Sequence, residues 1–188
     1  MIINLITLAT VKTYLGLSAT TYDAALTAMI PIVSADVRRI LNNQYDDYLV
    51  ASFDETATDM EVSASTVYGV KTPRLPLPIG TVVYNTNLPD DTYIAGYDSV
   101  LQVYTLSATP DDAGTSIYSH INISMWSTIS KMIWYRTQKL STDMPTGKVD
   151  SKTMGPLSIT YAKDEVNAKW DYPQALIDDL GTPYQRVG

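Results

Sequence analysis

The chain has 188 residues, a formal net charge of −7 and no cysteine. This length suits one domain with an insertion or two small domains, and the lack of cysteine excludes disulfides and thiolate metal sites. No basic stripe is present, which argues against tight binding to nucleic-acid phosphates. No stretch approaches the ~20 apolar residues that span a bilayer. Met1–Thr10 lacks the features of a signal peptide, so we expect a soluble protein without a membrane partner.

The first predicted element is a short helix over Thr10–Leu17. Thr7 or Thr10 can cap its start, and Gly16 is suited to its end. One face of the helix is apolar, with spacings of three and four residues between Leu8, Val11 and Leu15.

A longer helix follows, capped by Thr20 or Thr21 and continuing to Leu41. Its apolar residues have helical spacing over a stripe wide enough for a core face. Pro31 removes one backbone hydrogen bond, so we expect a kink or a brief break near Thr27–Ile30.

The periodicity of the hydrophobic residues then changes. Residues 45–59 are expected to be irregular. Short alternating segments bounded by Pro, Gly and Asp-Asp turns come next and favour a small antiparallel barrel or sandwich. The predicted strands are Met60–Ala64, Gly80–Asn85, Thr92–Gly96, Val100–Leu106 and Thr115–Tyr118.

Helical spacing returns over residues 122–140, where apolar and aromatic side chains surround most of the helix. Ser141–Pro156 contains several Gly and Pro residues and predicts an extended loop. Leu157–Ala162 alternates like a strand or one arm of a hairpin. Asp171–Gly181 predicts a short helix with Pro173 in its first turn.

These elements predict an α+β fold. A small helical bundle, residues 1–52 and 119–188, would carry an inserted antiparallel β-barrel or sandwich at residues 53–118. A C-terminal hairpin loop and a short helix complete the bundle.

Candidate chemistry is sparse. His120 is the single histidine, and a lone histidine without clustered carboxylates is a poor metal site. The four Asp-Asp pairs fit turn chemistry and solubility better than a cation site, because none has calcium-loop spacing. No glycine-rich phosphate loop or nucleophile motif occurs. We therefore expect no enzyme activity, no cofactor and no metal, and we rank a small hydrolase last among the alternatives.

Several segments resemble the head–tail connector (adaptor) proteins of tailed bacteriophages. The resemblance covers residues 1–45 and 119–188, and residues 53–118 depart from it. The matching segments are the short first helix, Ala25–Leu41 with its Ile30-Pro31 and Arg38-Arg39 pairs, Met154–Tyr161 (MGPLSITY), Tyr172–Leu180 (YPQALIDDL) and Pro183–Val187 (PYQRV).

The resemblance implies a virion structural protein that forms a ring, commonly of twelve copies, between the portal protein and the next tail or stopper component. DNA would pass through its lumen without specific binding. The protein would belong to the virion neck, and to the host cytoplasm during assembly. The residues implied at the subunit interface are Trp126, Trp134, Tyr135, Arg38 and Arg39. Those implied at the portal or tail interface are Trp170, Tyr172, Pro173, Tyr184, Arg186 and Val187.

One alternative of another class remains open, a virion module whose β-block binds carbohydrate or a host receptor. Aromatic side chains in the block could stack on sugars, but strand alternation would place some of them in the core. The candidates are Tyr68, Tyr84, Tyr93, Tyr97 and Tyr104.

Overall fold

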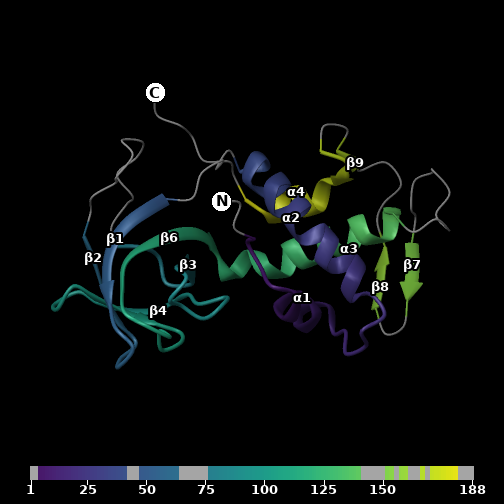
Figure 1. The fold of residues 1–188 in the computed structure, drawn as a ribbon. Coiled ribbons are helices and arrows are strands. Elements are labelled where there is room, and N and C mark those ends of the chain that lie inside the picture. The colour runs from purple at the N-terminus through teal and green to yellow at the C-terminus, as the bar shows by residue number, and fades with distance from the viewer. Residues whose placement is uncertain are drawn as a thin grey trace. The chain divides into compact units, whose positions relative to one another are not determined.

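A computed structural model describes residues 4–41, 47–63, 76–140, 151–154, 157–160, 166–167 and 170–181. The chain divides into two compact units (Figure 1). We call Met1–Gln44 with Met125–Gly188 the helical unit, and Tyr45–Ser124 the β-unit. The β-unit therefore extends beyond the expected bounds of 53–118 at both ends.

The helical unit contains three longer elements and one short helix. They are α1 (Leu8–Leu15), α2 (Asp23–Ile40), α3 (Trp126–Leu140) and α4 (Gln174–Asp179), with the 3₁₀ turn η1 (Ile123–Met125) immediately before α3. The helix α3 packs against α1, α2 and α4, so it forms the centre of the bundle. This arrangement explains why α3 has apolar residues on most of its circumference.

The ends of α1 follow the expected capping chemistry. The Thr7 side chain accepts a hydrogen bond from the amide of Thr10, and Gly16 closes the helix with a left-handed φ of 66°. A glycine adopts this φ without the steric cost that a Cβ would add. Of the two predicted caps, Thr7 and Thr10, Thr7 is the one observed, and the predicted stop at Gly16 is confirmed. The helix spans Leu8–Leu15, so it begins and ends two residues before the expected bounds of Thr10–Leu17.

Pro31 lies inside α2, and the helix continues from Asp23 to Ile40 without a break. The expected brief break near Thr27–Ile30 is therefore wrong, and the alternative, a kink, stays a prediction. Residues on both sides of Pro31, including Ile30 and Val33, are buried. We attribute the continuity to this packing, which offsets the one hydrogen bond that proline cannot make. The expected cap at Thr20 or Thr21 is also wrong, because the helix begins after Tyr22 with no side-chain cap.

The β-unit is an antiparallel sheet that curves into a half-barrel. Its described strands have the order β3-β6-β1-β2-β5-β4. They are β1 (Asp47–Phe53), β2 (Asp59–Ser63), β3 (Thr81–Tyr84), β4 (Ile94–Asp98), β5 (Val103–Leu106) and β6 (Gly114–Asn122). A single antiparallel bridge between Val82 and Tyr93 links edge strand β3 to the residue before β4.

Strand β1 corrects the expectation that residues 45–59 are irregular. Its residues pair with β6 from Asp47, opposite Ser119, to Phe53, opposite Gly114. This pairing also explains why the β-unit begins before residue 53 and ends after residue 118. Because apolar residues occupy both faces of Asp47–Phe53, the strand does not show the alternation that identifies a half-buried strand.

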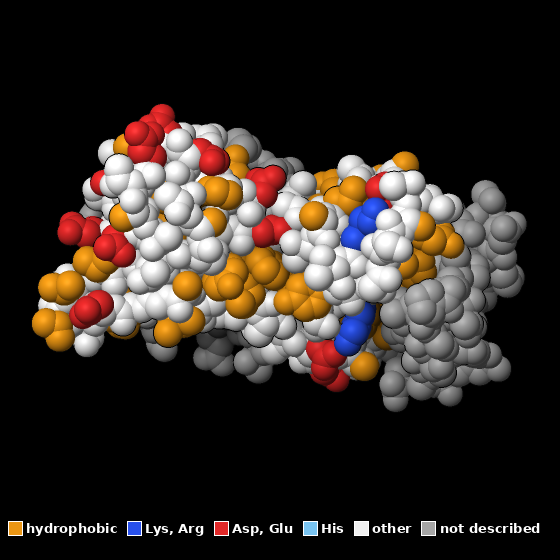
Figure 2. All heavy atoms as spheres, turned by 90° about the horizontal axis from the view of Figure 1, so that it is seen from below, with side chains coloured by type: hydrophobic (Ala, Val, Ile, Leu, Met, Phe, Trp, Pro, Cys, Tyr) orange, Lys and Arg blue, Asp and Glu red, His pale blue; other side chains and the backbone are white. Residues whose placement is uncertain are grey.

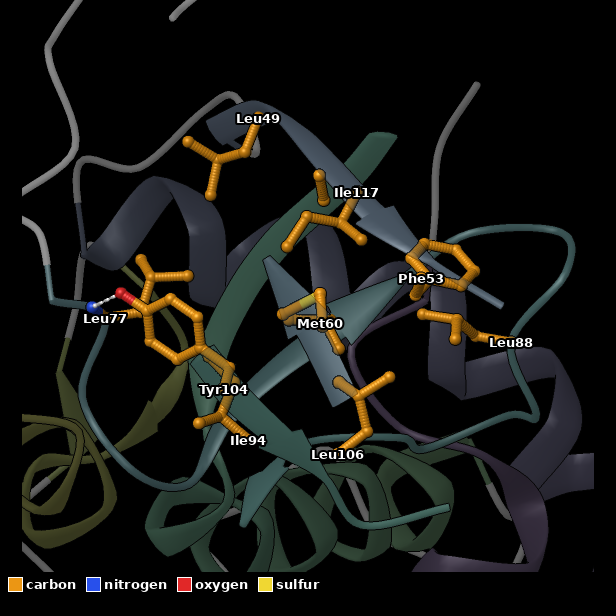
Figure 3. Packing of buried hydrophobic residues seen from close by; sticks show 11 residues of the cluster. Leu49, Phe53, Met60, Leu77, Leu88, Ile94, Tyr104, Leu106 and Ile117 are labelled. Atoms are coloured by element: carbon orange, nitrogen blue, oxygen red, sulfur yellow. Dashed lines mark hydrogen bonds between the residues drawn. The ribbon is translucent and has the colours of Figure 1, made fainter. Parts of the chain in front are cut away.

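The inner face of the sheet holds the core of the β-unit (Figure 3). Side chains from all six strands and two loops meet there, and the Tyr104 hydroxyl accepts a hydrogen bond from the amide of Leu77 at 3.0 Å. The buried members are Leu49, Ala51, Phe53, Met60, Leu77, Val83, Leu88, Ile94, Tyr104, Leu106 and Ile117.

Two short strand pairs lie between α3 and α4 in the sequence. Strands β7 (Ser151–Met154) and β8 (Leu157–Thr160) form an antiparallel pair, and β9 (Val166–Asn167) pairs with β10 (Tyr172–Pro173). The expectation of an extended loop through residue 156 is wrong for β7. Residues 141–150 and 155–156 lie outside the described residues. The predicted strand at Leu157–Ala162 is confirmed over β8.

Candidate interaction site

The three aromatic side chains of α3 that were expected at a subunit interface are all buried within the chain. Trp126 donates its indole N–H to the carbonyl of Leu5 at 3.2 Å. Trp134 meets the ring of Tyr22 edge to face, with centroids 5.2 Å apart. Buried indole groups usually have such a partner, so these side chains already have structural roles in their own unit. They leave little surface for a neighbouring chain.

The two arginines of α2 differ in their surroundings. Arg38 is buried, and its guanidinium donates to the carbonyl of Ser34 at 3.5 Å. Arg39 is exposed and lies 3.7 Å from Oδ1 of Asp36. Exposed pairs of this kind contribute little to stability, so Arg39 is the member of the expected subunit set with charge available at the surface.

A cluster around Arg136 joins α2, α3 and the segment before α4. The Arg136 guanidinium lies 3.2 Å from Oδ2 of Asp36 and 3.3 Å from Oδ2 of Asp171. It also lies over the ring of Tyr172, 4.6 Å from the centroid. A further hydrogen bond of 3.4 Å goes to the carbonyl of Trp170. Arginine suits this position because its planar group can bind several acceptors and stack on an aromatic ring together.

Tyr172 completes this cluster. Its side chain is fully buried, and its hydroxyl donates to Oδ2 of Asp36 at 2.8 Å. Burial raises the pKa of Tyr172 well above its usual value, while the hydrogen bond from Arg136 acts in the opposite direction. The phenol is therefore a neutral donor at physiological pH, and it anchors the C-terminal segment to α2.

The residues expected at the portal or tail interface divide into two groups. Trp170 is half-buried, and both Tyr172 and Pro173 are buried. Tyr184, Arg186 and Val187 lie outside the described residues. The described part of this set is thus the anchored base of the C-terminal segment.

Asp36, Asp171 and the linking role of Arg136 are not among the residues predicted from the sequence. An arginine on the apolar face of a helix is rarely buried without a partner. Arg136 lay on such a face in the predicted helix 122–140, and that observation alone called for an acidic partner elsewhere. Nothing in the sequence indicated which aspartates would supply it.

In the β-unit, three tyrosines occupy one row across neighbouring strands. Tyr118 is the register partner of Tyr84 on β3 and of Tyr48 on β1. The rings of Tyr48 and Tyr118 meet edge to face with centroids 5.0 Å apart. Tyr118 is exposed, while Tyr48 and Tyr84 are half-buried.

Other candidate sugar-stacking tyrosines have different positions. Tyr104 belongs to the core, and Tyr97 packs against it with centroids 4.6 Å apart. Tyr93 is half-buried, and Tyr68 lies outside the described residues. The expectation that strand alternation places some of these rings in the core is confirmed for Tyr104.

The described residues contain no group of three or more His, Asp or Glu side chains that could hold a metal ion. The side chain of His120 is outside what the structure describes. The Asp112 carboxylate accepts from the amide of Ala113 at 2.7 Å, and Asp91 adopts a φ of 59°. Both are features of turns, in line with the expected role of these Asp-Asp pairs.

In the part of the chain that the structure describes, no helix is both long enough and apolar enough to cross a bilayer. No model of a known protein family matches the sequence, and no curated protein matches it.

Proposed function

We propose that this chain is a structural adaptor of the neck of a tailed bacteriophage virion, where copies form a ring between the portal protein and the next tail or stopper component. The observation that carries the proposal is the order of elements around the β-unit. Helices α1 and α2 precede it, and α3, the β7–β8 pair and α4 follow it. This order accords with the helical bundle, intervening hairpin and C-terminal helix that the sequence resemblance implies.

The anchored C-terminal segment supports the same role. Arg136 and Asp36 fix Tyr172 on the bundle, so the described part of the C-terminal segment is anchored at this residue. We propose that the segment Trp170–Val187, with Tyr184, Arg186 and Val187, contacts the portal. The anchor at Tyr172 reduces the conformational entropy that such binding would cost.

DNA passes through the ring without specific binding. The net charge of −7 favours a lumen that repels phosphates rather than one that holds them. The chain performs no catalysis in this role. It resides in the virion neck and, during assembly, in the host cytoplasm, and the ring has about twelve copies, as the resemblance implies.

The proposal also treats the β-unit as a closed small barrel. The bridge at Val82 and Tyr93 supports closure, as do backbone hydrogen bonds from Gly80 to Ile94 at 2.7 Å and from Val83 to Thr92 at 2.9 Å. Closure removes exposed strand edges that would invite aggregation. Slow hydrogen exchange at the Val83 amide, comparable with the amides of β6, is the expected result.

The adaptor role is tested by mass photometry of the purified chain, alone and with a portal ring, followed by electron microscopy of the assemblies. We expect closed rings with an opening that admits duplex DNA, or rings formed on the portal. A chain that binds no portal ring and forms no closed assembly contradicts the proposal.

The tyrosine row supports a second candidate, a carbohydrate-binding virion module. Aromatic faces contribute large apolar area at recognition sites. In a glycan-binding assay, Tyr118→Ala would abolish binding, while Tyr14→Ala, at an exposed tyrosine of the helical unit, would not. Absence of glycan binding by the wild-type chain contradicts this candidate.

A further inference from the structure

The turn between β4 and β5 exposes two consecutive large apolar side chains. Val100 is 87% exposed and Leu101 is 71% exposed, more than any other large apolar residue in the described chain. Both lie within the predicted strand Val100–Leu106, but β5 begins only at Val103. Single exposed apolar residues are ordinary, whereas an adjacent pair at the end of a hairpin is a candidate contact surface.

The backbone of this turn is held in place. One carboxylate oxygen of Asp98 accepts from the amide of Val100 at 2.8 Å and from that of Leu101 at 3.0 Å. Gln102 adopts a left-handed φ of 59°, which reverses the chain into β5. Val100 and Leu101 are thus presented by a preformed turn, which lowers the entropy cost of binding. We call residues 98–102 the hairpin tip.

The tip lies in acidic surroundings. Glu61 on β2 and Asp98 on β4 both pair with Val103, so the three residues share one row of the sheet. Figure 2 shows apolar and acidic atoms side by side at the end of the β-unit where this hairpin turns. Residues 45–124 include eleven Asp and Glu but two Lys and Arg, a net charge of −9. A partner for the tip must therefore combine apolar surface with positive charge.

The helical unit has such a surface on α2. Its segments hold nine acidic and eleven basic residues, a net charge of +2. Ile32 is 47% exposed, and Arg39 lies two helical turns further along on the same face with its side chain 62% exposed. Ala28, which is exposed, and Ala35, which is half-buried, lie on this face too, so small side chains flank Ile32. We call it the α2 outer face.

We infer that the hairpin tip of one copy docks on the α2 outer face of a second copy, with Val100 and Leu101 against Ile32, and Asp98 and Glu61 near Arg39. The contact joins two different surfaces of the chain, so each copy can bind one neighbour on each side. Such head-to-tail contacts generate a ring when the rotation closes. This inference rests on the proposed ring and names a contact that builds it. The inferred contact takes the place of the subunit interface expected at Trp126 and Trp134 of α3, because these buried side chains have little surface for a neighbouring copy.

The test uses the full chain and two surface variants. The tip variant is Val100→Ser with Leu101→Ser, and the face variant is Arg39→Glu. A matched control is Ile79→Ser, which replaces another exposed apolar residue of the β-unit. Sedimentation velocity measures self-association. We expect wild type and control to assemble alike, and both interface variants to assemble about tenfold more weakly or worse.

Mixing the two variants distinguishes a head-to-tail contact from other arrangements. The tip variant keeps an intact α2 outer face and the face variant keeps an intact tip. Together they can form one contact and should give a dimer that grows no further. The inference is overturned if the tip variant fails to self-associate while the face variant assembles normally. In that case the tip binds another tip or a different surface.

Binding to a portal ring is measured in parallel. Wild type that binds portal but never self-associates, or variants that assemble like wild type, overturn the inference and leave the adaptor role standing. Loss of both portal binding and assembly in the wild-type chain overturns the adaptor role itself. Circular dichroism confirms that each variant is folded.

Discussion

Tyr172 donates its hydroxyl to Asp36 at 2.8 Å across 136 positions of the chain. Asp36 lies on α2, before the β-unit in sequence, and Tyr172 lies beyond α3. Arg136 binds the same carboxylate oxygen from α3. Asp36, Arg136 and Tyr172 therefore form a network that links three segments of the bundle. Each of the three side chains contacts the other two. Removing one member leaves a buried group with an incomplete set of partners.

Tyr172→Phe should destabilise the helical unit by about 1–3 kcal/mol, because Asp36 loses a buried donor while the ring remains in place. Tryptophan fluorescence during urea unfolding is the suitable measurement, since Trp126, Trp134 and Trp170 all belong to the helical unit. Tyr14→Phe, at an exposed ring, provides the control and should have no measurable effect. Equal free energies of unfolding for Tyr172→Phe and wild type would contradict the role of the hydroxyl.

The same residue gives a pH dependence. Burial raises the folded-state pKa of Tyr172 above the ordinary value of 10.0. The neutral phenol is thus favoured by folding, and its contribution is fully present below about pH 10 and lost as the pH rises through the folded-state pKa. The difference in free energy of unfolding between wild type and Tyr172→Phe should shrink as the pH rises from about 10 to about 11. A difference that grows over this range would show the opposite shift.

Trp134→Ala should destabilise the helical unit by about 3–5 kcal/mol through the cavity left in the core. The ring is buried and contacts Tyr22 edge to face. Its loss should therefore lower the free energy of unfolding of the single chain, whether or not the chain assembles. Trp134→Phe keeps an aromatic ring at this position and should cost less. The measurement is urea unfolding followed by far-UV circular dichroism. A fully stable Trp134→Ala chain that fails only in assembly would restore this residue to a subunit interface.

Local signals in the sequence were enough to predict that the helices exist, but not where each of them begins. Thr7 and Gly16 bound α1 through capping chemistry that acts over three or four residues. The wide apolar stripe of α2 was also visible, whereas its continuity through Pro31 was not. That continuity depends on packing with α3, and tertiary packing cannot be derived from proline's local cost alone.

The bounds of a strand were harder to predict where apolar and polar residues do not alternate. Tyr48 and Val50 face away from Leu49, and the resulting apolar run concealed β1. Val100 and Leu101 extended the predicted strand into a turn, because an apolar pair has the same appearance in sequence whether it is buried or exposed. The Arg136 cluster could not be predicted in full, since Asp36 and Asp171 meet it only in the folded bundle.

Gly114→Ala should destabilise the β-unit. Gly114 is the register partner of Phe53, and a Cβ added at Gly114 would overlap the Phe53 ring. The ring must then move within a packed core, at a cost of about 1–3 kcal/mol. Gly96→Ala is the matched control. Its added Cβ would lie 3.7 Å from Thr105, an ordinary contact, so loss of glycine flexibility should leave stability unchanged or slightly higher.

Hydrogen exchange of the β1 and β6 amides measures this effect directly, because the β-unit contains no tryptophan. Exchange should accelerate in Gly114→Ala and should stay at the wild-type rate, or become slightly slower, in Gly96→Ala. If the β1 and β6 amides of Gly114→Ala instead exchange at the wild-type rate, the Phe53 ring can adopt another rotamer and does not require a glycine at position 114. An equal increase of the exchange rate in both variants would contradict the specific role of the Phe53 ring. It would show that adding a Cβ at either glycine of this sheet is destabilising.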